Sequence, residues 1–187
     1  LLPMVDELLQ QLQFNKDQLD GIAYARGPGS FTGIRIAASV MQGIAMALDI
    51  PVAGISTLQG LAQKSMAEDG QSCVSVIDAH MGEVFWAHYE RRQGLAHLLG
   101  EEHVCTPEQF LQDAPKVMAV GNGLSLQALA ALGGDAEATL TAEDLAPLVL
   151  DAWENSLFGD IDQHPPVYLR DGVAWKKLSE QPSLLKR

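Results

Sequence analysis

The chain has 187 residues, 47% hydrophobic and 19% charged, a balance that predicts a globular protein and excludes a disordered one. Its net charge of -12 disfavours a direct grip on RNA or DNA, because Lys and Arg supply most nucleic-acid affinity. Its apolar stretches are interrupted before the roughly 20 residues that a membrane span needs, and two widely spaced cysteines, Cys73 and Cys105, are typical of a reducing cytoplasm.

Residues 1–70 alternate helical and strand patterns. Leucines and Val5 recur at helical spacing over 1–12, and a buried strand is expected over 21–25. A glycine-rich loop over 27–30 leads into a helix over 31–48, and a strand over 52–55 into a helix that ends near residue 68, capped by Ser56 or Thr57. Because the chain opens inside a helix and without Met, we expect the natural protein to begin upstream.

Residues 71–187 have a different texture, so we expect a boundary at Asp69-Gly70-Gln71. Strands are predicted over 73–77, over 83–90 and within 95–104. Pro107 starts a short helix, a strand over 117–120 precedes a turn and another helix, and Thr141–Asp144 resembles a capping box that opens the last long helix. The alternation predicts an α/β protein of two small lobes, 1–70 and 71–187.

The loop from Gly27 to Ser30 has two interpretations. A glycine-rich loop between a strand and a helix can hold phosphate on its free N–H groups and the helix dipole. A nucleotide P-loop also needs a Lys beside the Ser or Thr, and here the nearby cation is Arg35, inside the helix. A tight turn with Ser30 as the helix cap is therefore the favoured interpretation.

The helices over 1–12 and 31–48 predict a contact with another helix. Small residues four apart, as in Gly33–Ala37 and Gly43–Ala47, share a helix face and allow close approach of backbones. Their surplus apolar surface could be covered by a partner or by an upstream segment of this chain. The expected partner-binding residues are Leu1, Met4, Val5, Leu8, Leu12, Gly33, Ile36, Ala37, Val40, Gly43 and Ala47.

Asp78, His80 and Glu83 form the strongest candidate for chemistry. Two carboxylates and an imidazole within six residues can bind a metal or act as an acid–base pair. The alternative is a corner between two strands in which Asp78 accepts turn N–H groups. The corner is favoured, since no second ligand motif such as HExxH occurs and no base is placed beside either cysteine.

The C-terminus mixes aromatic and basic residues. Five of the twelve basic residues fall there: Arg170, Lys176, Lys177, Lys186 and Arg187. This tail could contact RNA or an acidic partner, although a solvated tail is the more common explanation.

Four segments, in order, resemble the TsaB family, also called YeaZ. They are Gly27-Pro-Gly-Ser-Phe-Thr-Gly-Ile-Arg35, Gly54-Ile-Ser-Thr-Leu58, Ile77-Asp-Ala-His-Met-Gly-Glu-Val-Phe-Trp86, and Tyr168-Leu-Arg170 with Val173-Ala-Trp-Lys-Lys177. The resemblance covers essentially the whole chain, and the tail is similar to the gammaproteobacterial branch.

The resemblance implies an actin-like ATPase (ASKHA) fold of two lobes, with the opening hairpin of the first lobe lying before Leu1. It implies a non-catalytic relative of TsaD that pairs with TsaD through a helical bundle and works with TsaE. The complex transfers threonylcarbamoyl, from an adenylate made by TsaC, to the adenosine beside the anticodon of tRNAs that read ANN codons. ATP or ADP would be bound by the assembled complex, with no cofactor or metal of this chain's own, and tRNA would be reached through the complex.

These expectations describe a cytoplasmic scaffold, homodimeric when alone. One rival is an actin-fold metal-dependent hydrolase or peptidase acting through Asp78, His80 and Glu83. A second rival is a small-molecule kinase of the same fold, against which the absent phosphate lysine argues.

Overall fold

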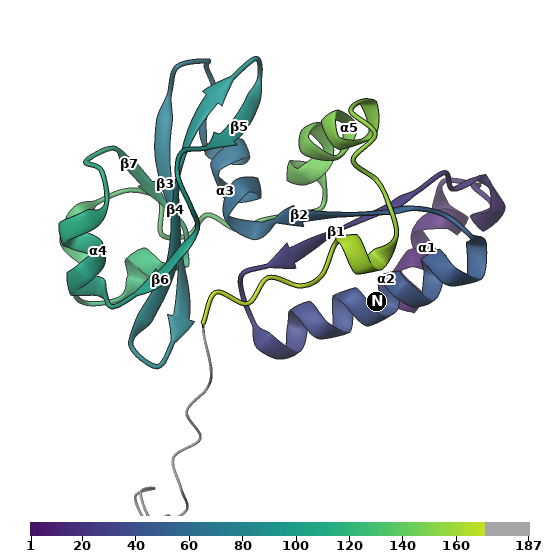
Figure 1. Ribbon diagram of the computed structural model, residues 1–187, viewed down its shortest axis with the longest axis horizontal. Helices are drawn as coiled ribbons and strands as arrows, with labels where there is room; N and C mark the ends of the chain where they lie inside the picture. Colours follow the sequence, from purple (N-terminus) through teal and green to yellow (C-terminus); the bar gives the residue numbers. More distant parts are fainter. Residues whose placement is uncertain (171–187) are drawn as a thin grey trace, which may run out of the picture.

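The structure is a computed structural model that describes residues 1–170 of the chain. Its described part holds two sheets that lie side by side, each with helices packed on it (Figure 1). The α/β class predicted from the alternation of strands and helices is thereby confirmed.

The region of the first sheet comes first in the chain. Its elements are α1 (Leu2–Gln11), the 3-10 turn η1 (Lys16–Gln18), β1 (Ile22–Gly27), α2 (Phe31–Leu48) and β2 (Val52–Ser56). The strands β1 and β2 pair in parallel, and α2 runs along one face of the pair, as Figure 1 shows. The helix α5 lies on the opposite side of this sheet and contacts β2.

The second region begins with the helix α3, and its last elements, from α5 onward, return to the first sheet. Its elements are α3 (Thr57–Ser65), β3 (Ser72–His80), β4 (Glu83–Arg92), β5 (Leu95–Leu98), β6 (His103–Cys105), α4 (Pro107–Asp113), β7 (Met118–Val120), η2 (Asn122–Ser125), η3 (Ala130–Leu132), η4 (Glu143–Leu145), α5 (Ala146–Glu154) and η5 (Ile161–Gln163). The sheet order is β5-β4-β3-β7, with β6 also paired to β4. All pairs are antiparallel except that between β3 and β7.

Most predicted elements occur within a few residues of their expected bounds, and α2 coincides with its prediction. Three predictions differ. The strand expected within 95–104 is divided into β5 and β6, and the helix expected after β7 is replaced by the short 3-10 turns η2 and η3. The capping box at Thr141 is only half formed: the Asp144 carboxylate accepts the Thr141 N–H, but the Thr141 hydroxyl donates to the same carboxylate. The turn η4 follows it, and α5 begins with no side-chain cap.

The strand β3 forms the centre of the second region. Its residues Cys73 to Ile77 are all buried, because helices or loops cover both faces of the sheet. One face packs with α3 through Leu58, Leu61 and Ala62, and the other packs with Phe110 of α4. A continuous apolar run is the pattern expected of a strand that is covered on both faces.

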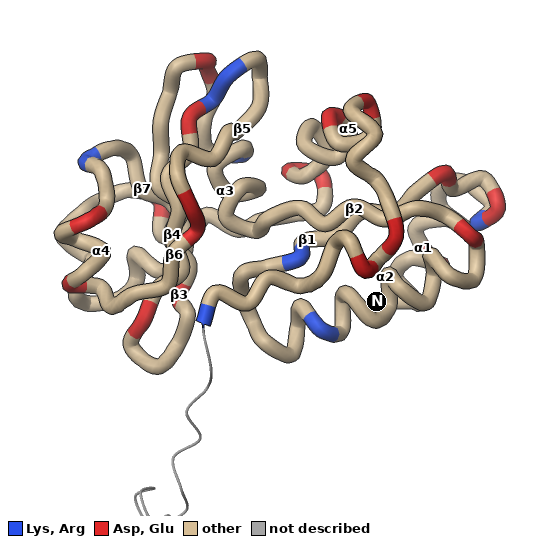
Figure 2. Tube along the Cα trace, in the orientation of Figure 1, with Lys and Arg blue, Asp and Glu red and all other residues tan. Residues whose placement is uncertain are grey.

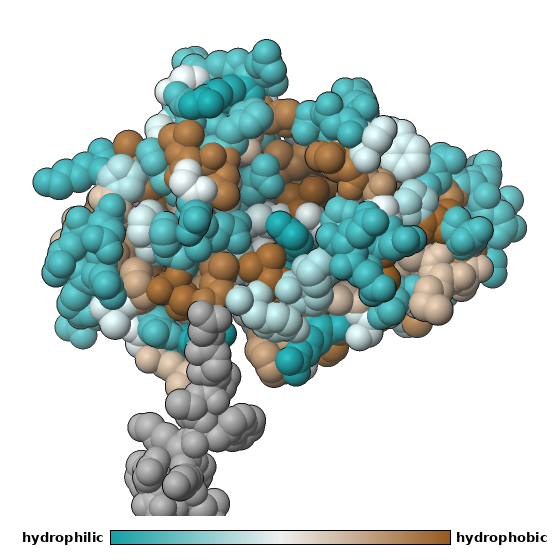
Figure 3. Space-filling view, viewed as in Figure 1, coloured by the Kyte–Doolittle hydropathy of each residue, from teal (hydrophilic) through white to brown (hydrophobic). Residues whose placement is uncertain are grey.

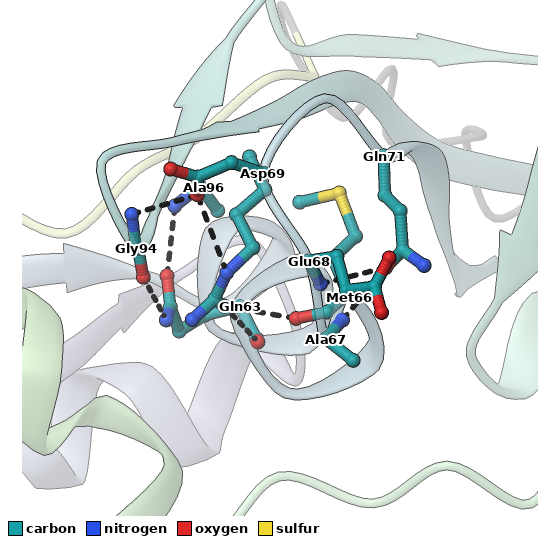
Figure 4. Close-up of polar contacts among 9 residues, drawn as sticks. Gln63, Met66, Ala67, Glu68, Asp69, Gln71, Gly94 and Ala96 are labelled. Atoms are coloured by element: carbon teal, nitrogen blue, oxygen red, sulfur yellow. Dashed lines mark hydrogen bonds and ion pairs between the residues drawn. The ribbon is translucent and has the colours of Figure 1, made fainter.

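The helix α3 is fixed to the β4–β5 hairpin by polar contacts as well as by its apolar side (Figure 4). The buried side chain of Gln63 donates to the Gly94 carbonyl at 2.9 Å and accepts the Ala96 N–H at 2.7 Å. The Arg91 guanidinium donates to the Met66 carbonyl at 2.8 Å. Since α3 also contacts β1 and β2, it joins the two sheets; the predicted division of the chain near residue 70 stays a prediction.

The helix α2 corrects one statement made from the sequence. Its 18 residues are long enough and apolar enough to cross a membrane, whereas no such stretch was expected. The core helix of a soluble protein passes the same test, and a single helix of this kind is weak evidence. Ile34, Met41 and Ala45 of α2 are buried on the first sheet, which explains much of its apolar character.

Candidate partner-binding surface

The helix α1 presents its apolar side chains to solvent. No residue of α1 is buried, and only Val5 and Leu9 are half-buried. Leu1, Met4, Leu8 and Leu12 remain 50%, 67%, 55% and 62% exposed. Isolated exposed leucines are common, but a row of them along one helix is a contiguous apolar surface of the kind found in interfaces.

The helix α2 also exposes apolar residues, on the side that faces away from its sheet. Ile36, Gly43, Ala47 and Gly33 are exposed, and Ala37 and Val40 are half-buried against the cluster around Tyr24. Met46, which the sequence did not single out, is 74% exposed. We call the exposed apolar residues of the two helices the α1–α2 face; that this face binds a partner stays a prediction.

The two glycines of α2 behave differently. A Cβ added at Gly43 meets no atom within 4 Å, so a side chain there would project into solvent. A Cβ at Gly33 would lie 3.3 Å from that of Ser30, whose hydroxyl caps the helix by accepting the Gly33 N–H. Gly43 can therefore be enlarged without disturbing the isolated chain.

An aromatic and cationic cluster lies at the beginning of α2. The Arg35 guanidinium is 3.6 Å from the centre of the Phe31 ring and 5.5 Å from that of Tyr168. Its Nε donates to the Tyr168 hydroxyl at 3.0 Å. The sequence placed Phe31, Arg35 and Tyr168 in motifs but gave no sign that they meet, because 133 residues separate Arg35 from Tyr168.

The glycine-rich loop is confirmed as a turn capped by Ser30. Gly27 has a φ of +99°, a conformation that side chains rarely adopt, and its backbone passes close to Val167. Arg35 lies beyond the first turn of α2 and is occupied with Phe31 and Tyr168, so the loop itself offers no cation to a phosphate.

Asp78, His80 and Glu83 lie at the corner between β3 and β4. The Asp78 carboxylate accepts the His80 N–H at 2.8 Å and lies 3.4 Å from His80 Nδ1. The Glu83 carboxylate pairs with Arg170, which also donates to the Ala79 and His80 carbonyls at 3.2 and 3.3 Å. Asp78 thus holds the corner as the alternative interpretation from the sequence expected, whereas the pairing of Glu83 with Arg170 was not foreseen.

Within residues 1–170, no three His, Cys, Asp or Glu side chains lie close enough together to hold a metal ion. The cysteines are free thiols, and burial raises the pKa of Cys73 to about 12. Burial also raises the pKa of Cys105, whose Sγ accepts a hydrogen bond from Trp86 Nε1 at 3.2 Å. Neither thiol has the low pKa of a nucleophile.

A hollow of about 330 Å³ lies on the α5 side of the first sheet. Figure 3 shows apolar surface in the hollow below α5, where Ile55, Leu148 and Ala152 are among the lining residues. Arg26 also lines it, and its Nε is buried without a hydrogen-bond partner among the described residues. The volume is at the lower end for ligand pockets, about 300–1,000 Å³.

The structure describes only the first residue of the basic tail expected from the sequence. Arg170 is the last described residue, and Val173–Lys177, Lys186 and Arg187 lie outside the described residues. Charges elsewhere follow the composition, with acidic residues spread over both regions and few basic ones (Figure 2).

Comparison with known proteins establishes the class of fold. A crystal structure of a Pseudomonas aeruginosa protein described as similar to peptidase YeaZ superposes with a TM-score of 0.80 and 38% identity, covering 90% of this chain and 82% of that one. The YeaZ structure from the same organism gives a TM-score of 0.79. A family model described as "TsaD: tRNA N6-adenosine threonylcarbamoyltransferase" matches residues 1–150. The fold is of the actin-like ASKHA type, as the sequence motifs implied.

The curated relatives define the family within this class. The tRNA threonylcarbamoyladenosine biosynthesis protein TsaB of Escherichia coli K12 is 36% identical over 95% of this chain and 82% of its own length. TsaB of Haemophilus influenzae is 35% identical over 95% and 81%. The chain belongs to the TsaB (YeaZ) family. A tRNA N6-adenosine threonylcarbamoyltransferase of Legionella pneumophila also matches, at 42% identity over 59 residues, or 32% of this chain and 18% of that protein.

Proposed function

We propose that this chain is a non-catalytic subunit of the complex that forms N6-threonylcarbamoyladenosine beside the anticodon of tRNAs reading ANN codons. It pairs with TsaD through the α1–α2 face and thereby activates TsaD, with TsaE joining the complex. Alone, the chain forms a homodimer through the same face. The reaction places it in the cytoplasm, and any ATP or ADP is held by the assembled complex.

The observation that carries the proposal is the exposed apolar surface of α1 and α2. Leu2 and Leu8 on α1 and Ile36 and Met46 on α2 are each more than half exposed, although core positions of similar type elsewhere in the chain are almost inaccessible. Contiguous exposed apolar surface favours burial against a protein partner. The net charge of -12 supports an indirect relation to tRNA, because the chain itself repels phosphate.

The state of Asp78 and Glu83 supports a non-catalytic role. Both carboxylates are engaged in holding the β3–β4 corner, and Glu83 is neutralised by Arg170. The rival hydrolase would need these groups free to bind a metal or move a proton. Stoichiometric zinc or iron in the purified protein would favour that rival.

The test is sedimentation of the full-length chain, alone and with TsaD from the same organism. We expect a one-to-one complex that displaces the homodimer, and Gly43→Leu should abolish it by overpacking the contact. Because Gly43 faces open space in the isolated chain, this variant should still fold cooperatively, which thermal unfolding at a concentration where the wild type is monomeric would show.

The matched control is Ala131→Leu, which creates the same side chain at an exposed position in the second region and should leave pairing intact. Gly33→Leu is a weaker test, since it also disturbs the Ser30 cap. Normal pairing of the Gly43→Leu variant would show that α2 is not the contact. Failure of the wild-type chain to associate with TsaD would reject the scaffold function.

A further inference from the structure

The Arg35 side chain is held in one orientation before any partner arrives. The Phe31 ring lies against its guanidinium, the Tyr168 ring is close by, and the Tyr168 hydroxyl accepts its Nε–H. A guanidinium that is fixed in this way loses little conformational entropy when it binds, so its Nη groups are pre-organised donors.

No carboxylate neutralises Arg35 within the part of the chain that the structure describes, where the ion pairs involve other basic residues. Arg35 is exposed, and it is the only basic residue in α1 and α2 (the blue segment along α2 in Figure 2). Planar guanidinium groups bind carboxylates in a paired, directional geometry. The Arg35 guanidinium is therefore suited to bind a carboxylate of a partner.

A shallow, open apolar groove of about 390 Å³ lies beside this cation on the surface of α2, which supplies all of its lining residues. Phe31, Ile36 and Val40 contribute its apolar lining, and Thr32, Arg35 and Ser39 complete it. Phe31 and Ile36 are 54% and 52% exposed. A segment that fits here would therefore bring apolar side chains together with a carboxylate on the same edge.

The helix α1 carries that combination. It has Asp6 and Glu7 and no basic residue, and Glu7 follows Met4 by three positions and directly precedes Leu8. Residues three apart share a helix edge, so the Glu7 carboxylate borders the exposed row that contains Met4 and Leu8. In its own chain Glu7 only accepts a hydrogen bond from Gln11, at 3.3 Å and fully exposed.

We propose that Arg35 binds Glu7 of a second copy of this chain, while Met4 and Leu8 of that copy's α1 enter the groove beside Phe31 and Ile36. In a two-fold dimer the same contact forms twice, once from each copy. This inference rests on the α1–α2 face of the proposed function, and it adds a charge recognition that sets the register of the helices. Aromatic and Arg side chains are the residue types that most often dominate binding energy.

The experiment is a charge exchange followed by sedimentation of the full chain over a range of concentrations. Arg35→Glu and Glu7→Lys should each raise the homodimer dissociation constant by about tenfold or more, since each puts like charges together. The double variant should recover to within about threefold of wild type, because the opposite charges are restored in exchanged positions. Higher salt should weaken the wild-type dimer.

The matched controls are Lys116→Glu and Glu154→Lys, which reverse exposed charges in other parts of the chain and should not alter self-association. Arg35→Gln removes the charge without reversing it and should weaken the dimer less than Arg35→Glu, and thermal unfolding establishes that each variant is folded.

A double variant no stronger than the weaker single variant would overturn the inference, and so would a wild-type chain that stays monomeric. Pairing with TsaD is measured in parallel. If TsaD still binds wild type and rejects Gly43→Leu, the proposed function survives the failure of the Arg35–Glu7 contact.

Discussion

The helix α1 and the strand β3 are both rich in apolar residues, and the structure places them in opposite environments. The five residues from Cys73 to Ile77 in β3 are covered on both faces of the sheet. In α1 no residue is buried, although half of its ten residues are Leu, Met or Val. Apolar composition is therefore explained by folding in the second region, whereas in α1 the described residues leave it uncovered.

The largest expected effect tests this difference with matched leucines. Leu58 of α3 is inaccessible, whereas Leu8 of α1 is 55% exposed. We expect Leu58→Ala to lower the free energy of unfolding by about 2–5 kcal/mol, because it leaves a cavity. Leu8→Ala should change it by less than about 0.5 kcal/mol. Urea denaturation of both variants, at a concentration where the chain is monomeric, measures this. An equal loss would mean that α1 is packed in the isolated protein.

The second effect concerns the polar attachment of α3 to the β4–β5 hairpin. Gln63→Ala removes the side chain that bonds both the Gly94 carbonyl and the Ala96 N–H. Leaving these groups unpaired should cost about 1–3 kcal/mol. Hydrogen exchange at the Ala96 amide should accelerate, whereas Gln42→Ala, at an exposed position of α2, should alter neither quantity. Unchanged exchange at Ala96 would contradict the attachment.

A smaller effect is expected at the contact between Arg170 and the β3–β4 corner. The Arg170 and Glu83 side chains are 25% and 33% exposed, so solvent weakens their attraction. Arg170→Gln should destabilise the protein by about 1 kcal/mol or less. Arg92→Gln, whose side chain is 58% exposed in its pair with Glu90, should have a still smaller effect. Equal losses in the two variants would show that the carbonyl contacts of Arg170 add nothing.

The smallest effect is a dependence of stability on pH. Burial lowers the pKa of His88 and of His164, with Arg26 also lowering the pKa of His164. The unfolded chain therefore binds protons first as the pH falls through the ordinary histidine pKa of about 6.5. Stability should be complete above this pH and decline below it, towards the lowered pKa values. His88→Gln with His164→Gln should flatten this slope; an unchanged slope would assign it to other groups.

Local patterns were sufficient for most of the fold. The period of α2, the cap at Ser30 and the continuous apolar run in β3 each arise from neighbouring residues, so the sequence predicts them directly. The prediction of a helix after β7 was wrong. The small apolar residues of this segment have a helical preference, but they form the 3-10 turns η2 and η3, since tertiary contacts can override such a preference.

Of the candidate surface, only the apolar residues of α1 and α2 could be predicted from the sequence. Spacing along α1 and α2 identifies which residues share a face, but it carries no information on segments that are remote in the chain. The cluster of Phe31, Arg35 and Tyr168 depends on a contact across 133 residues. The attachment of Glu83 to Arg170 likewise spans 87 residues. From the sequence, Tyr168 was only part of a motif, and Arg170 was assigned to the basic tail rather than to the β3–β4 corner.

The short segment from Tyr168 to Arg170 has a consequence for the length of the chain. Tyr168 contacts α2 of the first region, and Arg170 contacts the β3–β4 corner of the second. Two peptide units span at most about 7 Å, so the segment limits the distance between these two contacts. Surface connections usually accept insertions, but one extra residue here would put the two anchors out of register. Substitutions in this segment should therefore be tolerated better than insertions or deletions.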